Sequence, residues 1–306
     1  AFKLPNMLSP SAFANRDFTP VERGLTESRV LLFYLRMLFL PRNSELSLYH
    51  DDFEPSHSLW EPPTTALAIF TLVLISCAVW VARFRFPELL FAWGWFLVAH
   101  ALESSVFPLD LVYEHRNYFA TIGLLIVLPL SLRRIAAPGL RRVFVAFLAV
   151  YAGLLAFMTH DRALQWSNHV DWAVMEATNH PRSTRATYEL ARIYMVLMKS
   201  TGDDHYGELA DQALKQSTET NLPGVLPFMA RVQLAYFRGL EPDPEALHAV
   251  KEGFEHWPYR AVNTATLRSM VSCQVDGRCR LPDAQALAIL DAALRNTSVS
   301  TRERAE

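Results

Sequence analysis

Residues 62–82 read PPTTALAIFTLVLISCAVWVA, a stretch without a formally charged side chain that lies between Glu61 and Arg83. At about 1.5 Å per residue, a helix of this length is about 30 Å long, which matches the apolar core of a bilayer. The alternative is a buried helix of a soluble protein, where about 10 to 14 apolar residues would be ordinary. The length of the stretch therefore favours a membrane-spanning helix.

Three further stretches free of Asp, Glu, Lys and Arg follow the first one: residues 89–102, 117–132 and 143–160. Together the four stretches predict a transmembrane domain of about four helices over residues 62–160. The composition agrees with a divided chain, because 51% hydrophobic and 20% charged residues is apolar for a soluble protein but too polar for one wholly in lipid.

The arginines between these stretches predict how the chain is oriented. They occur in two alternate turns: Arg83 and Arg85, then Arg133, Arg134, Arg141 and Arg142. Positively charged turns stay in the cytoplasm, so both turns are expected on that side. By parity, residues 46–61 and 103–116 are outer loops and residues 161–306 lie outside. For a protein of the bacterial inner membrane, that compartment is the periplasm.

Residues 1–61 are predicted to lie at the outer face. In the helical stretch 24–40, Arg29 and Arg36 are seven residues apart and share one helical face. This amphipathic pattern favours an interfacial or re-entrant helix, although a full span with a cytoplasmic N-terminus also satisfies the parity. Since the chain opens on Ala1 rather than Met, we expect it to be part of a longer protein.

From residue 161 to residue 306 the pattern changes to amphipathic helices separated by Pro and Gly. Pro181, Pro223 and Pro258 are 42 and 35 residues apart, and tetratricopeptide (TPR) repeats have a period of about 34 residues. The pattern predicts TPR-like helix pairs, with a generic helical bundle as the alternative. The predicted fold is therefore all-α, with polytopic transmembrane helices followed by a soluble TPR-like domain.

Two of the three cysteines are close in sequence. Cys273 and Cys279 enclose a short loop and fall in the expected oxidising compartment, which predicts a disulfide between them. A metal site is the weaker alternative, because a pair of cysteines lacks the four ligands of structural zinc. Cys77 lies in the first apolar stretch and is expected to be a small packing residue.

The outer loop that leads into residues 117–132 carries the main candidate site: Glu114, His115, Arg116 and Tyr118. A guanidinium group offers a fork of donors to phosphate, and Tyr118 can stack or hydrogen-bond at the membrane interface. These groups can therefore hold a charged headgroup. The alternative is a solvated turn in which Arg116 extends to water and Tyr118 belongs to an aromatic belt.

The other outer loop carries a second polar cluster: His50, Asp51, Asp52 and His57. Such side chains can ligate a divalent cation that neutralises a diphosphate leaving group. They can also form part of an active-site wall or a solvated turn. His100 and Glu103 are candidates at the edge of the second apolar stretch.

The sequence EHRNYF at residues 114–119 resembles the E-x-R-x-Y-L-P element of GT-C-type transmembrane-and-TPR O-mannosyltransferases and their bacterial relatives. LLFYLRMLFLPRNSELSLYHDD, residues 31–52, resembles the loop before the later spans in that family. The similarity covers about residues 20–260. The chain departs from the family pattern at Phe119 and Ala120, where the family has Leu-Pro.

The resemblance implies transfer of a sugar from a polyprenyl-phosphate donor in the membrane lipid to an acceptor, with an acceptor protein held by the TPR-like domain. It also implies that Glu114, Arg116 and Tyr118 contact the lipid-linked phosphate. The catalytic residues are unknown, because the family's catalytic carboxylate belongs to a first outer loop that this chain lacks. The sequence predicts no definite cofactor, and a divalent cation stays a hypothesis.

Two rival functions remain. One is a non-catalytic, membrane-anchored TPR scaffold for protein–protein interaction. The other is a polysaccharide polymerase or ligase of similar topology. Such enzymes have arginine-rich outer loops, and this chain has few arginines in the predicted outer loops before the repeats, which counts against this function. A nucleic-acid partner is not expected, because no basic stripe or nucleic-acid-binding motif is present.

Overall fold

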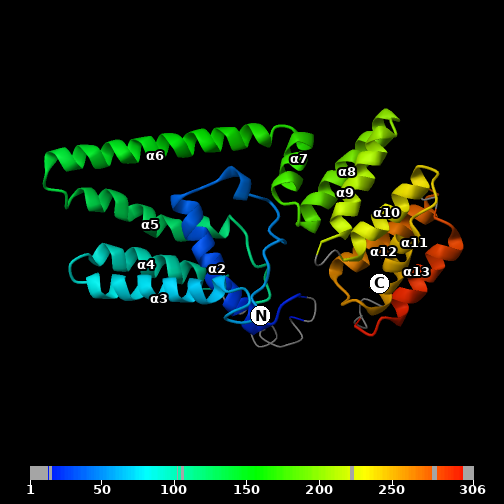
Figure 1. Cartoon of the computed structure of the whole chain (residues 1–306), viewed down its shortest axis with the longest axis horizontal. Coiled ribbons are helices and arrows are strands. Elements are labelled where there is room, and N and C mark those ends of the chain that lie inside the picture. The colour runs from blue at the N-terminus through cyan, green and yellow to red at the C-terminus, as the bar shows by residue number, and fades with distance from the viewer. Residues whose placement is uncertain are drawn as a thin grey trace. The chain divides into compact units, whose positions relative to one another are not determined.

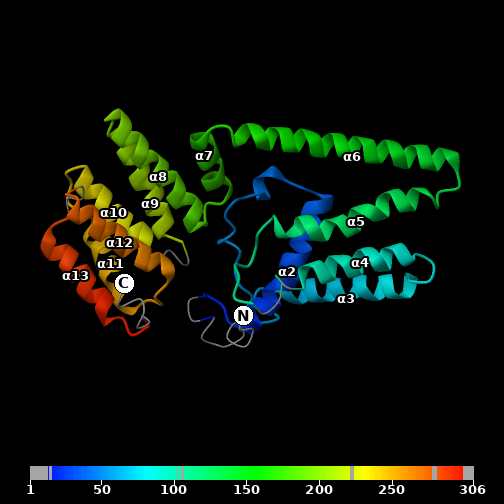
Figure 2. The ribbon, with the colours of Figure 1, turned by 180° about the vertical axis from the view of Figure 1, so that it is seen from behind.

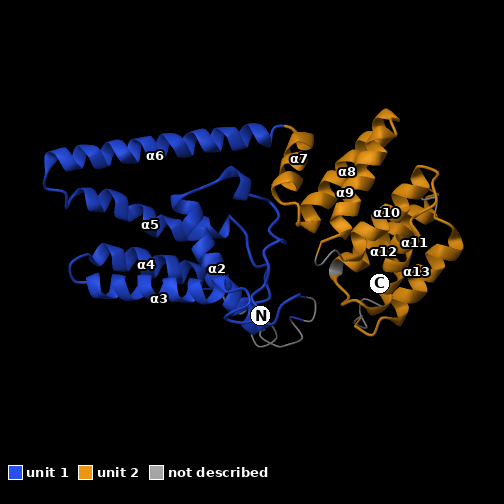
Figure 3. Ribbon diagram, in the orientation of Figure 1, with its two compact units in different colours: residues 1–167 blue, residues 168–306 orange. Residues whose placement is uncertain are grey.

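The computed structural model describes residues 13, 16–101, 103–104, 107–220, 224–277 and 281–298. Every regular element within these residues is a helix and none is a strand, which confirms the predicted all-α class (Figure 1). The chain divides into unit 1, residues 1–167, and unit 2, residues 168–306 (Figure 3).

Helix α2, Pro20–Phe39, opens unit 1 and begins four residues before the predicted start. Thr19 explains the earlier start, since its hydroxyl accepts a hydrogen bond from the Glu22 amide and the Glu22 carboxylate accepts one from the Thr19 amide. This capping box satisfies two otherwise free backbone donors. The short 3-10 helix η2, Asn43–Glu45, follows, and the loop after it contacts α2 through Arg29, which donates to the Glu54 carbonyl, and through the His57–Glu22 pair.

The four predicted spans are all helical: α3, Thr64–Ala82; α4, Pro87–His100; α5, Arg116–Leu132; and α6, Pro138–Gln165. Of the described helices, α3 and α6 are long and apolar enough to cross a membrane. With 14 and 17 residues, α4 and α5 are shorter, about 21 and 26 Å at 1.5 Å per residue.

The two long helices leave most of their surface uncovered. In their most apolar 18-residue windows, 11% of α3 and none of α6 is buried. Large apolar side chains point outward from both, among them Leu67, Phe70, Val81, Val143, Phe147 and Phe157. The core helix of a soluble protein is mostly buried, and soluble monomers rarely expose contiguous apolar patches beyond a few hundred Å². The exposed apolar surfaces of α3 and α6 thus support an association of unit 1 with a membrane.

The two arginine-rich turns lie at the same end of unit 1 (Figures 1 and 2). Arg134, after α5, donates to the carbonyl of Arg85 at 2.7 Å and pairs with Glu88 at 2.6 Å. The turn between α3 and α4 is thereby tied to the turn between α5 and α6. The loops at residues 40–63 and 101–115 join the opposite ends of these helices.

Helices α3, α4 and α5 pack side by side. Trp93 of α4 donates to Ser76 of α3 at 3.0 Å, and Trp95 donates to the carbonyl of Phe119 in α5 at 3.0 Å. The second contact depends on Gly123. A Cβ atom there would lie 2.7 Å from the Cβ of Trp95, which is closer than two carbon atoms approach.

We predict that Gly123→Ala destabilises unit 1 by about 1–3 kcal/mol, because the added methyl group forces α4 and α5 apart. Gly94→Ala, one helix away, is the matched control. It adds the same methyl group to open space in α4 and is expected to be neutral or slightly stabilising, since Ala is the better helix former. Thermal unfolding of the detergent-solubilised chain measures both, and equal midpoints would contradict the described packing.

Unit 2 contains seven helices in its described residues: α7, His169–Asn179; α8, Thr184–Thr201; α9, His205–Thr218; α10, Val225–Phe237; α11, Pro244–His256; α12, Ala261–Val275; and α13, Asp283–Arg295. Neighbours pair along the chain, α8 with α9 and α10 with α11. Ala191, Leu214 and Leu234 share one core, and Val250, Phe254 and Ile289 belong to a second. Whether these pairs are TPR repeats stays a prediction.

Two sequence predictions for unit 2 involve residues that the structure does not describe. Cys273 is near the end of α12, but Cys279 lies outside the described residues, as does Pro223. The disulfide between Cys273 and Cys279 therefore stays a prediction. Cys77 of α3 is a free cysteine and is exposed rather than packed.

Candidate functional site

The two predicted polar clusters touch at the start of α5, through Glu114 and His50. The Glu114 carboxylate accepts a hydrogen bond from the Ser47 amide at 2.6 Å and lies 3.3 Å from Nε2 of His50. The His50 side chain is only 5% exposed, whereas that of Glu114 is 21% exposed. Residues 64 positions apart thus form a carboxylate–imidazole pair that can accept or donate a proton.

The neighbours of Glu114 face in different directions. His115 is exposed at the N-cap of α5, with its ring centroid 5.2 Å from that of Tyr113. Tyr118, one turn into the helix, is 70% exposed. Its side chain therefore lies at the surface of unit 1.

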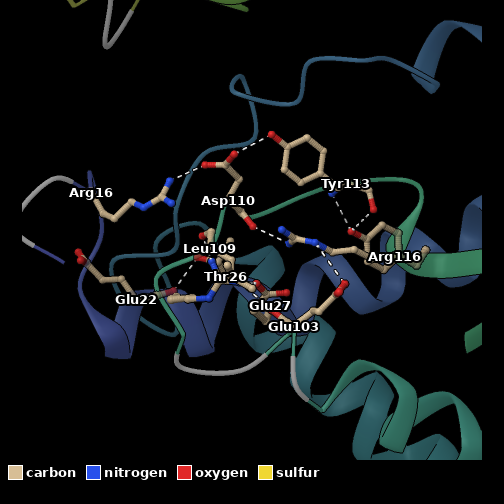
Figure 4. A network of polar contacts seen from close by, with 11 residues as sticks. Arg16, Glu22, Thr26, Glu27, Glu103, Leu109, Asp110, Tyr113 and Arg116 are labelled. Carbon is tan, nitrogen blue, oxygen red and sulfur yellow. Dashed lines mark hydrogen bonds and ion pairs between the residues drawn. The ribbon is translucent and has the colours of Figure 1, made fainter. Parts of the chain in front are cut away.

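Arg116 turns inward and joins the polar network in Figure 4. Its side chain is 7% exposed, and its Nε lies 3.3 Å from the Glu103 carboxylate. It also donates to the carbonyl of Asp110 at 2.6 Å and covers the ring of Tyr113 at 4.9 Å. Part of the donor fork predicted to face a phosphate is therefore occupied by Glu103, which is itself 41% exposed.

The same network contains a buried ion pair that the sequence analysis missed. Arg23 and Glu27, one turn apart on α2, have fully or almost fully buried side chains and lie 2.8 Å apart. Arg23 also donates to the carbonyls of Leu109 and Glu103, the latter at 2.8 Å. Burying these charges is costly unless they are paired and hydrogen-bonded, so they fix α2 against the loop before α5.

Tyr34 forms the second attachment of α2 to this loop. Its hydroxyl donates to the Tyr113 carbonyl at 2.9 Å and accepts from the Tyr113 amide at 2.9 Å. The amide group of Asn117 donates to the Tyr34 carbonyl at 3.1 Å. Burial raises the pKa of Tyr34 to about 12, so the phenol remains a neutral donor in ordinary conditions. Glu114 on this loop and Arg116 at the start of α5 are thus held in place.

Asp110 completes the outer side of the network. Its carboxylate pairs with Arg16 and accepts a hydrogen bond from the Tyr113 hydroxyl at 2.7 Å. Arg16, at the start of the described chain, is therefore part of the same polar layer. His100 lies beneath this layer, buried, with its ring stacked on Tyr34 at 5.3 Å.

The remaining candidates of the loop at residues 46–61 do not gather around a metal. Asp51 is exposed beside the half-buried Asp52, and His57 pairs with Glu22 of α2 at 2.6 Å. In the part of the chain that the structure describes, no group of three His, Cys, Asp or Glu side chains is placed to hold a metal ion. The possible divalent cation stays a hypothesis without a described ligand set.

Some of the missed residues carry a local signal in the sequence. Thr19 and Glu22 have the spacing of a capping box, and Arg23 and Glu27 have the i, i+4 spacing of a helical ion pair. A helix that begins at Pro20 rather than at Gly24 contains both the capping box and the ion pair. Asp110 carries no such signal, because its partners are distant in sequence.

The chain matches no protein-family profile and no curated protein, and it matches no solved structure.

The network also shifts the pKa of the Glu27 carboxyl group. Burial raises its pKa from 4.5 to about 7, although Arg23 opposes the rise. The folded chain therefore holds this proton more tightly than the unfolded chain. The resulting stabilisation is fully present below about pH 4.5 and is lost as the pH rises through about 7.

We predict that Glu27→Gln abolishes this pH dependence, because the amide does not titrate. The wild-type chain should lose on the order of 2–3 kcal/mol of unfolding free energy relative to the variant as the pH rises across this range. Thermal unfolding as a function of pH measures the difference. Glu241→Gln, at an exposed position of unit 2, is the control and should track the wild type. If Glu27→Gln also tracks the wild type, Glu27 is ionised throughout.

Proposed function

We propose that this chain is part of a membrane glycosyltransferase that moves a sugar from a polyprenyl-phosphate donor to an acceptor protein on the outer face of the membrane. In this proposal unit 1 lies in a bacterial inner membrane and unit 2 lies in the periplasm. The exposed apolar surfaces of α3 and α6 support the membrane location.

The main support for the donor site is that the His50–Glu114 pair and the inward-turned Arg116 lie at the same end of the apolar helices. The arginine-rich turns lie at the other end, where Arg134 joins them. A lipid-linked phosphate has its charge at the membrane surface and its chain in the bilayer. The start of α5 offers a polar and an apolar environment, because polar side chains lie beside the exposed Tyr118 and Phe119.

Arg116 is the phosphate-binding group in this proposal. Its present partner Glu103 is more exposed than Arg116 itself, so a phosphate oxygen can take the place of the carboxylate without exposing the buried guanidinium to lipid. Glu114 and His50, at the same end of the helices, are the proton-transfer pair in this proposal. The helix pairs of unit 2 would hold the acceptor protein.

The proposal predicts opposite effects for two variants in binding polyprenyl-phosphate mannose to the detergent-solubilised chain. Arg116→Ala should weaken binding by about tenfold or more, because it removes a charged hydrogen-bond donor to the phosphate. Glu103→Gln should strengthen binding, because it removes the carboxylate that competes with the phosphate. Binding is measured by retention of the radiolabelled donor.

The matched control is Arg192→Ala, which removes an arginine paired with Glu189 at 2.6 Å on the surface of α8. It should leave donor binding unchanged. If the wild-type chain retains no donor, or if Glu103→Gln and Arg116→Ala weaken retention alike, the donor site is refuted. Membrane insertion without donor binding would favour the non-catalytic scaffold.

A further inference from the structure

An open hollow of about 470 Å³ lies where α6 follows the second arginine-rich turn. Arg141 and Arg142 line it, and Val145, Ala146 and Ala149 form its apolar wall. Residues 141, 145 and 149 are four apart on α6 and therefore share one helical face. The hollow thus has a charged end and an apolar end along the same helix.

The charged end lacks anionic partners. The exposed side chains of Arg133, Arg141 and Arg142 make no hydrogen bond or ion pair with any described residue. In contrast, the neighbouring Arg134 is paired with Glu88. The first turn of α6 contains no acidic residue either, although negative charge is what the start of a helix favours. These positive charges are therefore available to an external anion.

The apolar end lacks a protein covering. Helix α6 packs closely against none of the other described helices. Val145 is 47% exposed, and Ala146 and Ala149 beside it are exposed as well. A small soluble anion would neutralise the arginines but would leave this wall uncovered. An amphiphile with an anionic headgroup matches both ends.

We infer that this hollow binds an anionic phospholipid, with the phosphate at Arg141 and Arg142 and an acyl chain along Val145 and Ala149. The lipid belongs to the leaflet on the side of the arginine-rich turns, which is the opposite end of unit 1 from His50 and Glu114. Basic pockets beside transmembrane helices are suited to such headgroups. The lipid would also cover part of α6 that no described helix covers.

This inference uses the membrane location from the proposed function but not the glycosyl transfer. It differs from the general role of arginines in orientation, which requires only positive charge and no hollow. Two properties therefore distinguish a binding site from simple charge attraction: dependence on Arg141 and Arg142 in particular, and dependence on the shape of the apolar wall.

The test is a native mass-spectrometry titration of the full chain with phosphatidylglycerol and, separately, with phosphatidylcholine. The wild type should bind phosphatidylglycerol in preference. The double variant Arg141→Gln/Arg142→Gln should lose about 25-fold in affinity, since each basic residue contributes a factor of about five near an anionic surface. The matched control, Arg182→Gln/Arg185→Gln, removes the same charge from unit 2 and should bind as the wild type does.

A second variant, Val145→Trp, fills the hollow and keeps both arginines. It should also weaken phosphatidylglycerol binding, and unchanged binding would overturn the site in favour of surface charge alone. Free glycerol phosphate should compete poorly, because it has no acyl chain; competition equal to that of the lipid would overturn the lipid assignment. Equal affinity for phosphatidylcholine would overturn it too. Retained binding of polyprenyl-phosphate mannose by the double variant keeps this result separate from the donor site.

Discussion

The separation of charged groups from the apolar helix surfaces is the constraint on which unit 1 depends. Between Glu61 and Arg83 no side chain carries a formal charge, and the ion pairs of Arg134 and Arg116 lie at opposite ends of the helices. One end holds the arginine-rich turns, joined through Arg134. The other holds the network of Arg23, Glu27 and Arg116. This is the distribution that a bilayer favours, since charges are costly in its core while its surfaces accept them, and it agrees with the membrane location that we propose for unit 1.

The buried Arg23–Glu27 pair explains how the loop before α5 acquires a fixed shape without regular structure of its own. A buried ion pair contributes little net stability compared with apolar packing, but it disfavours arrangements that leave either charge unpaired. Here Arg23 binds carbonyls of the loop before α5, and Tyr34 holds the same loop by the Tyr113 backbone. The candidate donor site therefore rests on α2, the helix that packs beside α3.

The sequence predicted the helices better than the site, because helix formation is local and site formation is not. The uncharged run at residues 62–82 predicts α3 to within two residues of its start. In contrast, His50 and Glu114 belonged to separate clusters in the sequence, and only the fold brings them to 3.3 Å. Arg116 was expected to face a ligand, yet its orientation depends on Glu103 and Asp110, which lie on the preceding loop. The capping box of Thr19 and Glu22 is visible in the sequence, and a helix that begins at Pro20 places Arg23 and Glu27 one turn apart as an ion pair.

Cys77 offers the most direct test that the apolar helices lie in lipid, because it is a native, exposed cysteine within α3. With Cys273 and Cys279 replaced by serine, a nitroxide attached to Cys77 of the chain in lipid vesicles reports its surroundings by electron paramagnetic resonance. Our account predicts relaxation by oxygen, which dissolves in the bilayer core, and little relaxation by a water-soluble nickel complex. Strong relaxation by the nickel complex would place α3 in water and would contradict the account.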